Sequence, residues 1–295
     1  MPISEDQLQR WSKPGPTAQF TATYDTLKTV LNDPLSPYYL KDFAIFLQGS
    51  YKNDTNVYGD SDVDVVVRLD SIFFTDLDYL SPDEKARYQA QRSPGTYTLA
   101  EFRRSVVEWL TKKYGSDVKP GKKAIFIKGN GNRRDADVLV CAKLKRYYTF
   151  PAIGNPRVAE GICFFLPDGT RVDNYPELHS DNCTTKHQNT RSWFKHTVRI
   201  FKNLRNTMIE KLIIADGLAP SYFIEGMLYN VPEPKFGGTE QQNFRDVLVW
   251  LLQADRTKFL CANEQFYLLG NSQVTWPAEN CAKFLVAAEK YWNEA

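Results

Sequence analysis

Short apolar runs separated by polar turns give the first part of the chain the pattern of a β-sheet. Runs of about four to eight apolar or β-branched residues bounded by polar residues are typical of buried strands. Six such runs predict strands: residues 43–47, 63–67, 123–128, 135–141, 162–166 and 171–175. The turn 129–132 would join the third strand to the fourth, and a Pro-Asp-Gly-Thr turn at 167–170 would close a hairpin of the last two.

In other stretches apolar residues recur every three or four positions, which predicts amphipathic helices. These stretches are residues 17–32, 99–110, 190–211, 220–229, 240–253 and 277–292. A short helix capped by Ser4 and a polar helix from about residue 81 complete the set. Because strands dominate the first part of the chain and helices the last, we expect an α+β fold.

The polar stretch 176–189 lies between these two parts, and we interpret it as the crossing from one domain to the other. We expect a core of residues 1–188, in which helix 17–32 braces a mixed sheet with flanking helices, and a helical C-terminal lobe of residues 189–295. A length of 295 residues with 42% hydrophobic content is enough for one large domain or two ordinary ones.

Two aspartates alternate with valines at the start of the second predicted strand. Successive side chains of a strand point to opposite faces, so Asp62 and Asp64 share one face while Val63 and Val65 point into the core. Two carboxylates this close repel each other unless a cation lies between them. The pair predicts a metal site, with magnesium as the expected ion, unless it is only a solvated strand edge.

A glycine and a serine, Gly49 and Ser50, follow the first predicted strand. Glycine lets the backbone approach a phosphate without a Cβ in the way, and the serine hydroxyl with the following N–H groups can donate to it. Alone, this pair also fits an ordinary turn. Its position before the Asp-x-Asp strand favours a site where a phosphate meets a metal.

A further candidate ligand lies in the later strand DADVLVC at 135–141. We choose Asp137 because apolar residues flank it, and we expect Asp135 to pair with the neighbouring Arg133 or Arg134. Three carboxylates would hold two metal ions about 3.5 to 4 Å apart. The alternative is that both aspartates are surface charges.

The predicted helix 190–211 carries a basic side next to its apolar side. Lys195, Arg199, Lys202 and Arg205 or Asn206 line it. Such a face is usually solvated, but opposite an acidic metal site it can hold a triphosphate.

Composition narrows the classes of function. Lys plus Arg number 37 and Asp plus Glu 35, and this net charge of +2 is small for a protein that binds a duplex backbone. Five scattered cysteines without a CxxC pair, and only three histidines, argue against a disulfide framework, a zinc ribbon or a Ser-His-Asp hydrolase. No apolar run approaches the roughly 20 residues of a membrane span, and MPISEDQLQR lacks a signal-peptide pattern. We expect a cytoplasmic protein without membrane contact.

The order of Gly-Ser, Asp-x-Asp and a lone later Asp resembles the nucleotidyltransferase superfamily typified by DNA polymerase beta. More of the chain resembles one branch, the bacterial cGAS/DncV-like nucleotidyltransferases (CD-NTases). The resemblance spans nearly the full length and is carried by QGSYKNDTNVYGDSDVDVVV (48–67), RRDADVLVC (133–141), WFKHTVRIFKNLRN (193–206) and APSYFIEGMLYNVP (219–232). It implies a polymerase beta-like core and a helical lobe with a cleft between them.

The resemblance also implies roles for residues of this chain. Lys202 and Ser221 would bind the triphosphate tail, and Tyr222 would stack on a base unless it is a core aromatic on a buried helix. Six further residues would bind the donor phosphates or two Mg²⁺ ions, which Mn²⁺ could replace. They are the phosphate contacts Gln48, Gly49 and Ser50 and the catalytic metal ligands Asp62, Asp64 and Asp137.

The function implied is synthesis of a cyclic di- or trinucleotide second messenger that activates an antiphage effector. The substrates would be ATP and a second nucleoside triphosphate, with GTP favoured, and the product would contain adenine, as in cyclic GMP-AMP. The effector is reached through the diffusible product, the protein is expected to be a monomer, and no nucleic-acid activator is expected. Alternatives are a linear nucleotide polymerase, a transferase that modifies a protein, RNA or drug, and an inactive nucleotide-binding protein.

Overall fold

The computed structural model describes residues 3–58 and 62–294, and within them the chain forms two compact units. The sheet unit contains residues 17–48 and 62–175. The helical unit contains residues 3–16, 49–58 and 176–294. Residues 49–58 therefore belong to the helical unit, although the chain before and after them belongs to the sheet unit.

The sheet unit is built on one mixed sheet of seven strands in the order β1-β2-β5-β4-β3, with β6 on β5 and β7 on β6. Strands β2 and β5 are parallel, and the other neighbouring pairs are antiparallel. The strands are β1 (Phe43–Leu47), β2 (Val63–Asp76), β3 (Val118–Pro120), β4 (Ile125–Ile127), β5 (Ala136–Thr149), β6 (Arg157–Phe165) and β7 (Arg171–Asn174).

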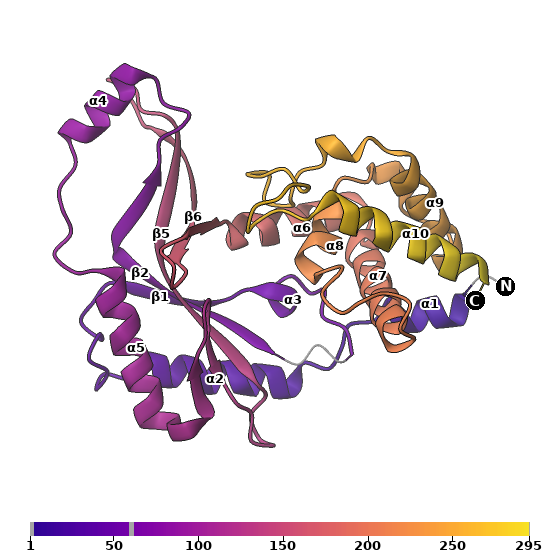
Figure 1. Cartoon of the computed structure of the whole chain (residues 1–295), viewed down its shortest axis with the longest axis horizontal. Coiled ribbons are helices and arrows are strands. Elements are labelled where there is room, and N and C mark those ends of the chain that lie inside the picture. Colours follow the sequence, from indigo (N-terminus) through magenta and orange to yellow (C-terminus); the bar gives the residue numbers. More distant parts are fainter. Residues whose placement is uncertain (1–2, 59–61, 295) are drawn as a thin grey trace. The chain divides into compact units, whose positions relative to one another are not determined.

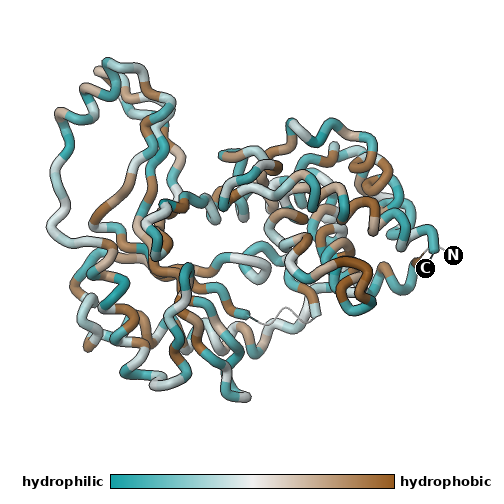
Figure 2. Tube along the Cα trace, in the orientation of Figure 1, coloured by the Kyte–Doolittle hydropathy of each residue, from teal (hydrophilic) through white to brown (hydrophobic). Residues whose placement is uncertain are grey.

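Two helices, α2 (Ala18–Leu31) and α5 (Leu99–Tyr114), pack on this sheet, as Figure 1 shows. The buried stripe of α5 consists of Leu99, Phe102, Val106, Trp109 and Leu110, as the periodicity predicts. The valines of β2 and most apolar residues of β5 are buried, and β1 is partly buried beside β2. Figure 2 shows hydrophobic, brown stretches along the strands of this unit. A third helix, α4 (Pro82–Ala90), lies at the far end of the long strands β2, β5 and β6.

The helical unit has its own core. Helix α7 contributes most to it, through Phe194, Val198, Phe201, Leu204 and Met208, all of which are fully buried. The helices are α1 (Glu5–Trp11), α3 (Gly49–Lys52), α6 (Pro176–Asn189), α7 (Trp193–Glu210), α8 (Ser221–Tyr229), α9 (Glu240–Gln253) and α10 (Ala278–Glu294). Short 3₁₀ turns are η1 (Gly115–Asp117) in the sheet unit and η2 (Glu233–Lys235) and η3 (Arg256–Lys258) here.

The predicted α+β class, with a mixed sheet, flanking helices and a helical C-terminal part, is confirmed. Residues 176–189, which the sequence indicates as the crossing between the two parts, form α6 and bury His179, Ser180 and Cys183. The contact-based division also differs from a boundary at residue 188, since it assigns all of α6 and residues 3–16 and 49–58 to the helical unit.

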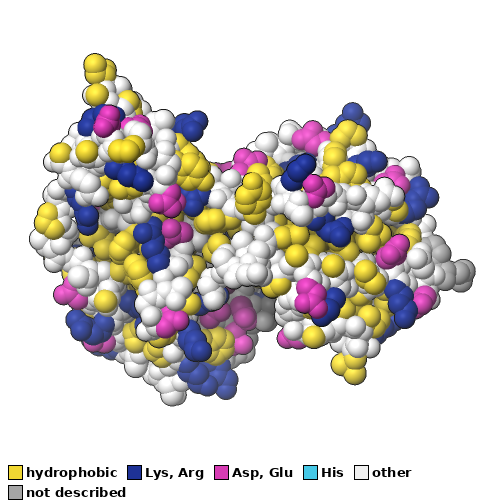
Figure 3. Space-filling view, turned by 45° about the horizontal axis from the view of Figure 1, so that its top comes forward, with side chains coloured by type: hydrophobic (Ala, Val, Ile, Leu, Met, Phe, Trp, Pro, Cys, Tyr) yellow, Lys and Arg dark blue, Asp and Glu magenta, His cyan; other side chains and the backbone are white. Residues whose placement is uncertain are grey.

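On the face in Figure 3 acidic and basic side chains are interspersed, in line with the net charge of +2. No helix in residues 3–58 and 62–294 is both long enough and apolar enough to cross a bilayer.

Candidate active site

The predicted carboxylates lie where the two parallel strands begin. Asp64 of β2 and Asp137 of β5 are directly paired in register, so their side chains share one face of the sheet. Asp62, immediately before β2, is exposed, whereas Asp64 and Asp137 are half-buried. The neighbouring Val63 and Val65 are fully buried, as the alternation predicts.

The electrostatics of this face fit a cation. Burial raises the pKa of Asp137, and the nearby carboxylates of Asp62 and Asp135 raise it further. A group that is costly to ionise beside other acids is stabilised when a divalent cation neutralises them. Oxygen ligands of this kind are those that Mg²⁺ prefers, so the donor set fits that ion.

Asp135 stabilises a turn, whereas Asp137 lies on the face that it shares with Asp64. Its carboxylate accepts a 2.6 Å hydrogen bond from the Gly129 N–H and so closes the turn between β4 and β5. Arg133 pairs instead with Asp117 at 3.2 Å, and an ion pair of Asp135 with Arg134 stays a prediction. Asp137 is left on the face that it shares with Asp64.

The Gly-Ser pair begins the four-residue helix α3 of the helical unit. Gly49 has a φ of 74°, in the left-handed region that residues with a Cβ rarely adopt, so a glycine is required there. Gln48, the last residue before it, donates its N–H to the Asp64 carbonyl at 3.1 Å within the sheet unit. The Gln48 Oε1 atom is buried without a hydrogen-bond partner in the described part of the chain.

The basic side of α7 is buried. Lys202 is fully buried and donates to the Thr55 carbonyl at 2.8 Å, while Arg199 donates to the Asp54 carbonyl at 2.6 Å. The alternative of a solvated basic face is therefore wrong for these two side chains, whose charged groups donate to backbone carbonyls. The role of Lys202 in holding a triphosphate stays a prediction.

Ser221 and Tyr222 both lie at the start of α8. The cation next to Ser221 is Arg205, whose Nη2 donates to the serine hydroxyl at 3.3 Å. The Tyr222 ring stacks on His179 with centroids 4.8 Å apart, and its hydroxyl accepts a 2.9 Å hydrogen bond from Asn263. Base stacking by Tyr222 also stays a prediction.

The sequence did not single out Glu225, which is buried on α8 and bonded to residues after the Gly-Ser pair. The signal was present, because Glu225 is the one charged residue in the apolar helix PSYFIEGMLY. A charged residue at a buried helical position requires a partner.

The chain is similar to known proteins in sequence and in structure. A family model described as the cGAS/DncV-like nucleotidyltransferase C-terminal helical domain matches residues 181–293. A cyclic UMP-AMP synthase of Rhodothermus marinus is 40% identical over 294 residues, which cover 99% of this chain and 98% of that protein.

Two of the solved structures that are similar over nearly the whole chain are cyclic dinucleotide synthases. The Rhodothermus marinus CdnE c-UMP-AMP synthase with Apcpp and Upnpp has a TM-score of 0.88 at 38% identity, covering 99% of this chain and 97% of that one. The Elizabethkingia meningoseptica CdnE cyclic dinucleotide synthase with GTP and Apcpp has a TM-score of 0.77 at 32% identity, covering 99% and 98%.

Proposed function

Because the chain belongs to the cGAS/DncV-like nucleotidyltransferases and is an enzyme of that class, we propose that it condenses two nucleoside triphosphates into a cyclic dinucleotide. The observation that carries this proposal is the direct pairing of Asp64 with Asp137 beside Asp62. It supports a carboxylate site for metal-dependent phosphoryl chemistry.

We propose that Asp62, Asp64 and Asp137 hold two Mg²⁺ ions, which Mn²⁺ can replace. When bound, such ions supply charge stabilisation to the attacking hydroxyl and to the leaving phosphate. The raised pKa of Asp137 suits a group that takes part in proton transfer, so Asp137 is our candidate to accept the proton of the acceptor hydroxyl.

In each of two steps a 2′ or 3′ hydroxyl oxygen attacks the α-phosphorus of a donor nucleotide. A P–O bond forms, the bond to the bridging oxygen of the β-phosphate breaks, pyrophosphate leaves, and the hydroxyl proton passes to the Asp137 carboxylate. The second step closes the ring. Gln48, Gly49 and Ser50 are proposed to hold the donor phosphates during both steps.

We propose that residues of α7 and α8 bind the triphosphate and the base. Ser221 would bind the triphosphate tail with Lys202, and the Arg205 guanidinium next to Ser221 is a further cation for it. Tyr222 would present its ring to a base.

We propose that the product contains adenine. Both solved structures described above hold the adenosine triphosphate analogue Apcpp, one with Upnpp and the other with GTP. ATP is therefore the first substrate that we assign, and UTP and GTP are the candidates for the second. We further propose that the product is a diffusible second messenger that activates an antiphage effector.

Incubation with labelled nucleotide mixtures and Mg²⁺, followed by phosphatase and chromatography, tests the proposal. A cyclic product has no terminal phosphate and survives phosphatase, whereas a linear oligonucleotide retains a triphosphate that phosphatase removes. Label found only on linear chains, or on an added protein or RNA, would replace the synthase with one of the alternative transferases.

A further inference from the structure

Glu225 is a buried carboxylate whose partners lie far away in the sequence. Its side chain is 2% exposed, and its oxygens accept hydrogen bonds from Thr55 Oγ1 at 2.5 Å and from Asn53 Nδ2 at 2.9 Å. His179 Nε2 lies 2.7 Å from the same oxygen that Asn53 contacts. A buried carboxylate with this many donors is held firmly, and its donors are held with it.

Two of the residues that bond to Glu225, Asn53 and Thr55, belong to one short polar segment, residues 53–56. Asn53, Thr55 and Asn56 are 5%, 0% and 1% exposed, which is unusual for polar side chains. Lys202 and Arg199 of α7 donate to the carbonyls of Thr55 and Asp54. Helix α7 thus fixes the backbone of the segment, and Glu225 of α8 fixes its side chains.

This segment directly follows the helix α3 that carries Gly49 and Ser50. The Asn53 N–H donates to the Gly49 carbonyl at 3.1 Å, and the Thr55 N–H donates to the Ser50 carbonyl at 2.9 Å. The peptide groups of the Gly-Ser pair are therefore linked to Glu225 through one residue each. All of these residues lie in the helical unit.

We propose that Glu225 is a positioning residue, which fixes through Asn53 and Thr55 the backbone that binds the donor phosphates. The proposal rests on the proposed function, since it takes Gly49 and Ser50 as phosphate contacts. Fixed N–H groups bind an anion without paying to order a loop at the moment of binding. Loosening the anchor weakens the binding of the triphosphate.

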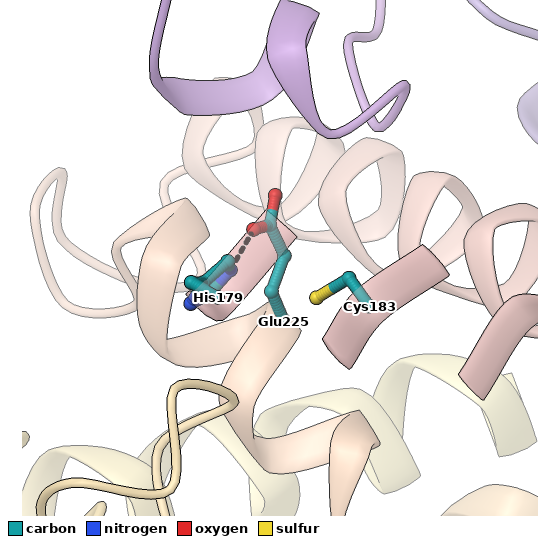
Figure 4. A group of neighbouring side chains, drawn as sticks. All are labelled: His179, Cys183 and Glu225. Atoms are coloured by element: carbon teal, nitrogen blue, oxygen red, sulfur yellow. Dashed lines mark hydrogen bonds and ion pairs between the residues drawn. The ribbon is translucent and has the colours of Figure 1, made fainter. Parts of the chain in front are cut away.

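The same carboxylate belongs to a second arrangement, drawn in Figure 4. His179, Cys183 and Glu225 bring ligand-type atoms within 4.8 Å of one another, a grouping of three that no other His, Cys, Asp or Glu side chains reach in the described residues. A zinc ion there would compete for the Glu225 carboxylate with Thr55, Asn53 and His179, which already take three of its about four lone-pair positions. The hydrogen bonds therefore favour an anchor over a metal centre.

The test uses two substitutions of Thr55, one of which removes the hydroxyl while the other keeps it. Thr55→Val keeps the shape and removes the donor to Glu225, and Thr55→Ser keeps the donor. We expect Thr55→Val to raise the KM for the donor triphosphate about tenfold, with kcat changed much less. The substitution removes a hydrogen bond to a charged group, which loosens the backbone that binds the donor phosphates and so weakens substrate binding. Thr55→Ser should restore the wild-type KM.

Asn243→Ala is the matched control. Asn243 is fully buried in the same unit, and its side chain donates to Thr197 of α7 at 2.8 Å and accepts from the Gly237 N–H at 3.1 Å. It should lower the melting temperature as Thr55→Val does and leave the KM unchanged. Asn53→Ala removes the second donor of segment 53–56 to Glu225 and should also raise the KM. It replaces Thr55→Val in the test if that variant is poorly folded.

Each outcome decides a different claim. Wild-type KM values in both folded Thr55→Val and Asn53→Ala would overturn the anchor, and so would one zinc per chain by elemental analysis that is lost in His179→Ala. An inactive wild-type protein would instead overturn the proposed function, and nucleotide binding measured by calorimetry would still report on the anchor.

Discussion

Ionisation of Asp137 is unfavourable for the stability of the fold but is required for its proposed role in catalysis. Its pKa is raised by burial and by the charge of Asp62 and Asp135, so the folded protein holds this proton to a higher pH than the unfolded chain does. The stability that it contributes is present below the unfolded pKa of about 3.8 and is lost as the pH rises through the folded pKa. At neutral pH the ionised carboxylate therefore destabilises the fold.

Asp137→Asn should separate these two effects. We expect its melting temperature at pH 7 to equal or exceed that of the wild type, because the amide carries no charge to desolvate. We expect product formation to fall by at least about a hundredfold, because a metal ligand and proton acceptor is lost. Thermal melting and product chromatography on the same sample measure both.

Asp135→Asn is the control for this pair of measurements. Its carboxylate accepts from the Gly129 N–H, so the substitution should weaken the turn and cost far less activity than Asp137→Asn. Equal losses of activity in both variants would contradict the separate roles.

His187 predicts a second dependence on pH. Burial first, and then the positive charges of Lys195, His196 and Arg199, lower its pKa to about 4, against a smaller opposing effect of Asp54. The unfolded chain takes up this proton near pH 6.5 and the folded protein does not. Stability should therefore be present above pH 6.5 and decline as the pH falls from 6.5 toward 4.

Melting curves across this range, for the wild type and for His187→Asn, measure the effect. The asparagine Oδ1 can still accept from the Lys195 N–H, as His187 Nδ1 does at 3.2 Å, but asparagine does not titrate. The variant should lose less stability between pH 6.5 and 4. An identical decline in both proteins would assign the acid sensitivity to other groups.

At the residue scale the sequence predicted the acidic site because strand alternation is a local property. Asp62, Asp64 and Asp137 each follow from their own apolar neighbours, and the register of β2 with β5 then pairs two of them. The anchor at Glu225 is not local, because Asn53 and Glu225 are 172 residues apart. Only the lone charge in an apolar helix indicated that a partner exists.

At the scale of single elements, α5 shows how a helix start is specified. Thr98 accepts from the Glu101 N–H at 3.2 Å, and the Glu101 carboxylate accepts from the Thr98 N–H at 2.8 Å. Thr98→Ala should cost about 1 kcal/mol, which corresponds to roughly fivefold faster hydrogen exchange of amides in α5. Catalysis should be unchanged at low temperature.

Thr111→Ala is the control on the same helix, because Thr111 is exposed and lies away from the cap. It should leave exchange in α5 near the wild-type rate. Equal exchange rates in the two variants would mean that packing of the buried stripe, rather than the cap, sets the stability of this helix.

Helix α6 was missed for a physical reason. Its sequence PELHSDNCTTKHQN is polar on every side, so no apolar stripe indicates a helix. It is stabilised instead by burial of His179, Ser180 and Cys183, and by the contact of His179 with Glu225. Tertiary partners of this kind are invisible to a periodicity argument.

At the scale of the whole molecule, metal binding should be visible as stability. Three carboxylates of like charge share one face of the sheet unit, and a divalent cation relieves their repulsion. Addition of millimolar Mg²⁺ to chelator-treated protein should raise the melting temperature by a few degrees. An unchanged melting temperature in the wild type, or an equal rise in Asp62→Asn with Asp64→Asn, would contradict a cation site at these residues.

The central claim is that these aspartates carry nucleotidyl transfer. The most direct measurement is the mass and rate of product formed from all four nucleoside triphosphates and Mg²⁺, by the wild type and by a double variant, Asp62→Asn with Asp64→Asn. We predict an adenine-containing cyclic dinucleotide from the wild type, and none from a folded, monodisperse double variant. Product formed by that variant at the wild-type rate would contradict the account.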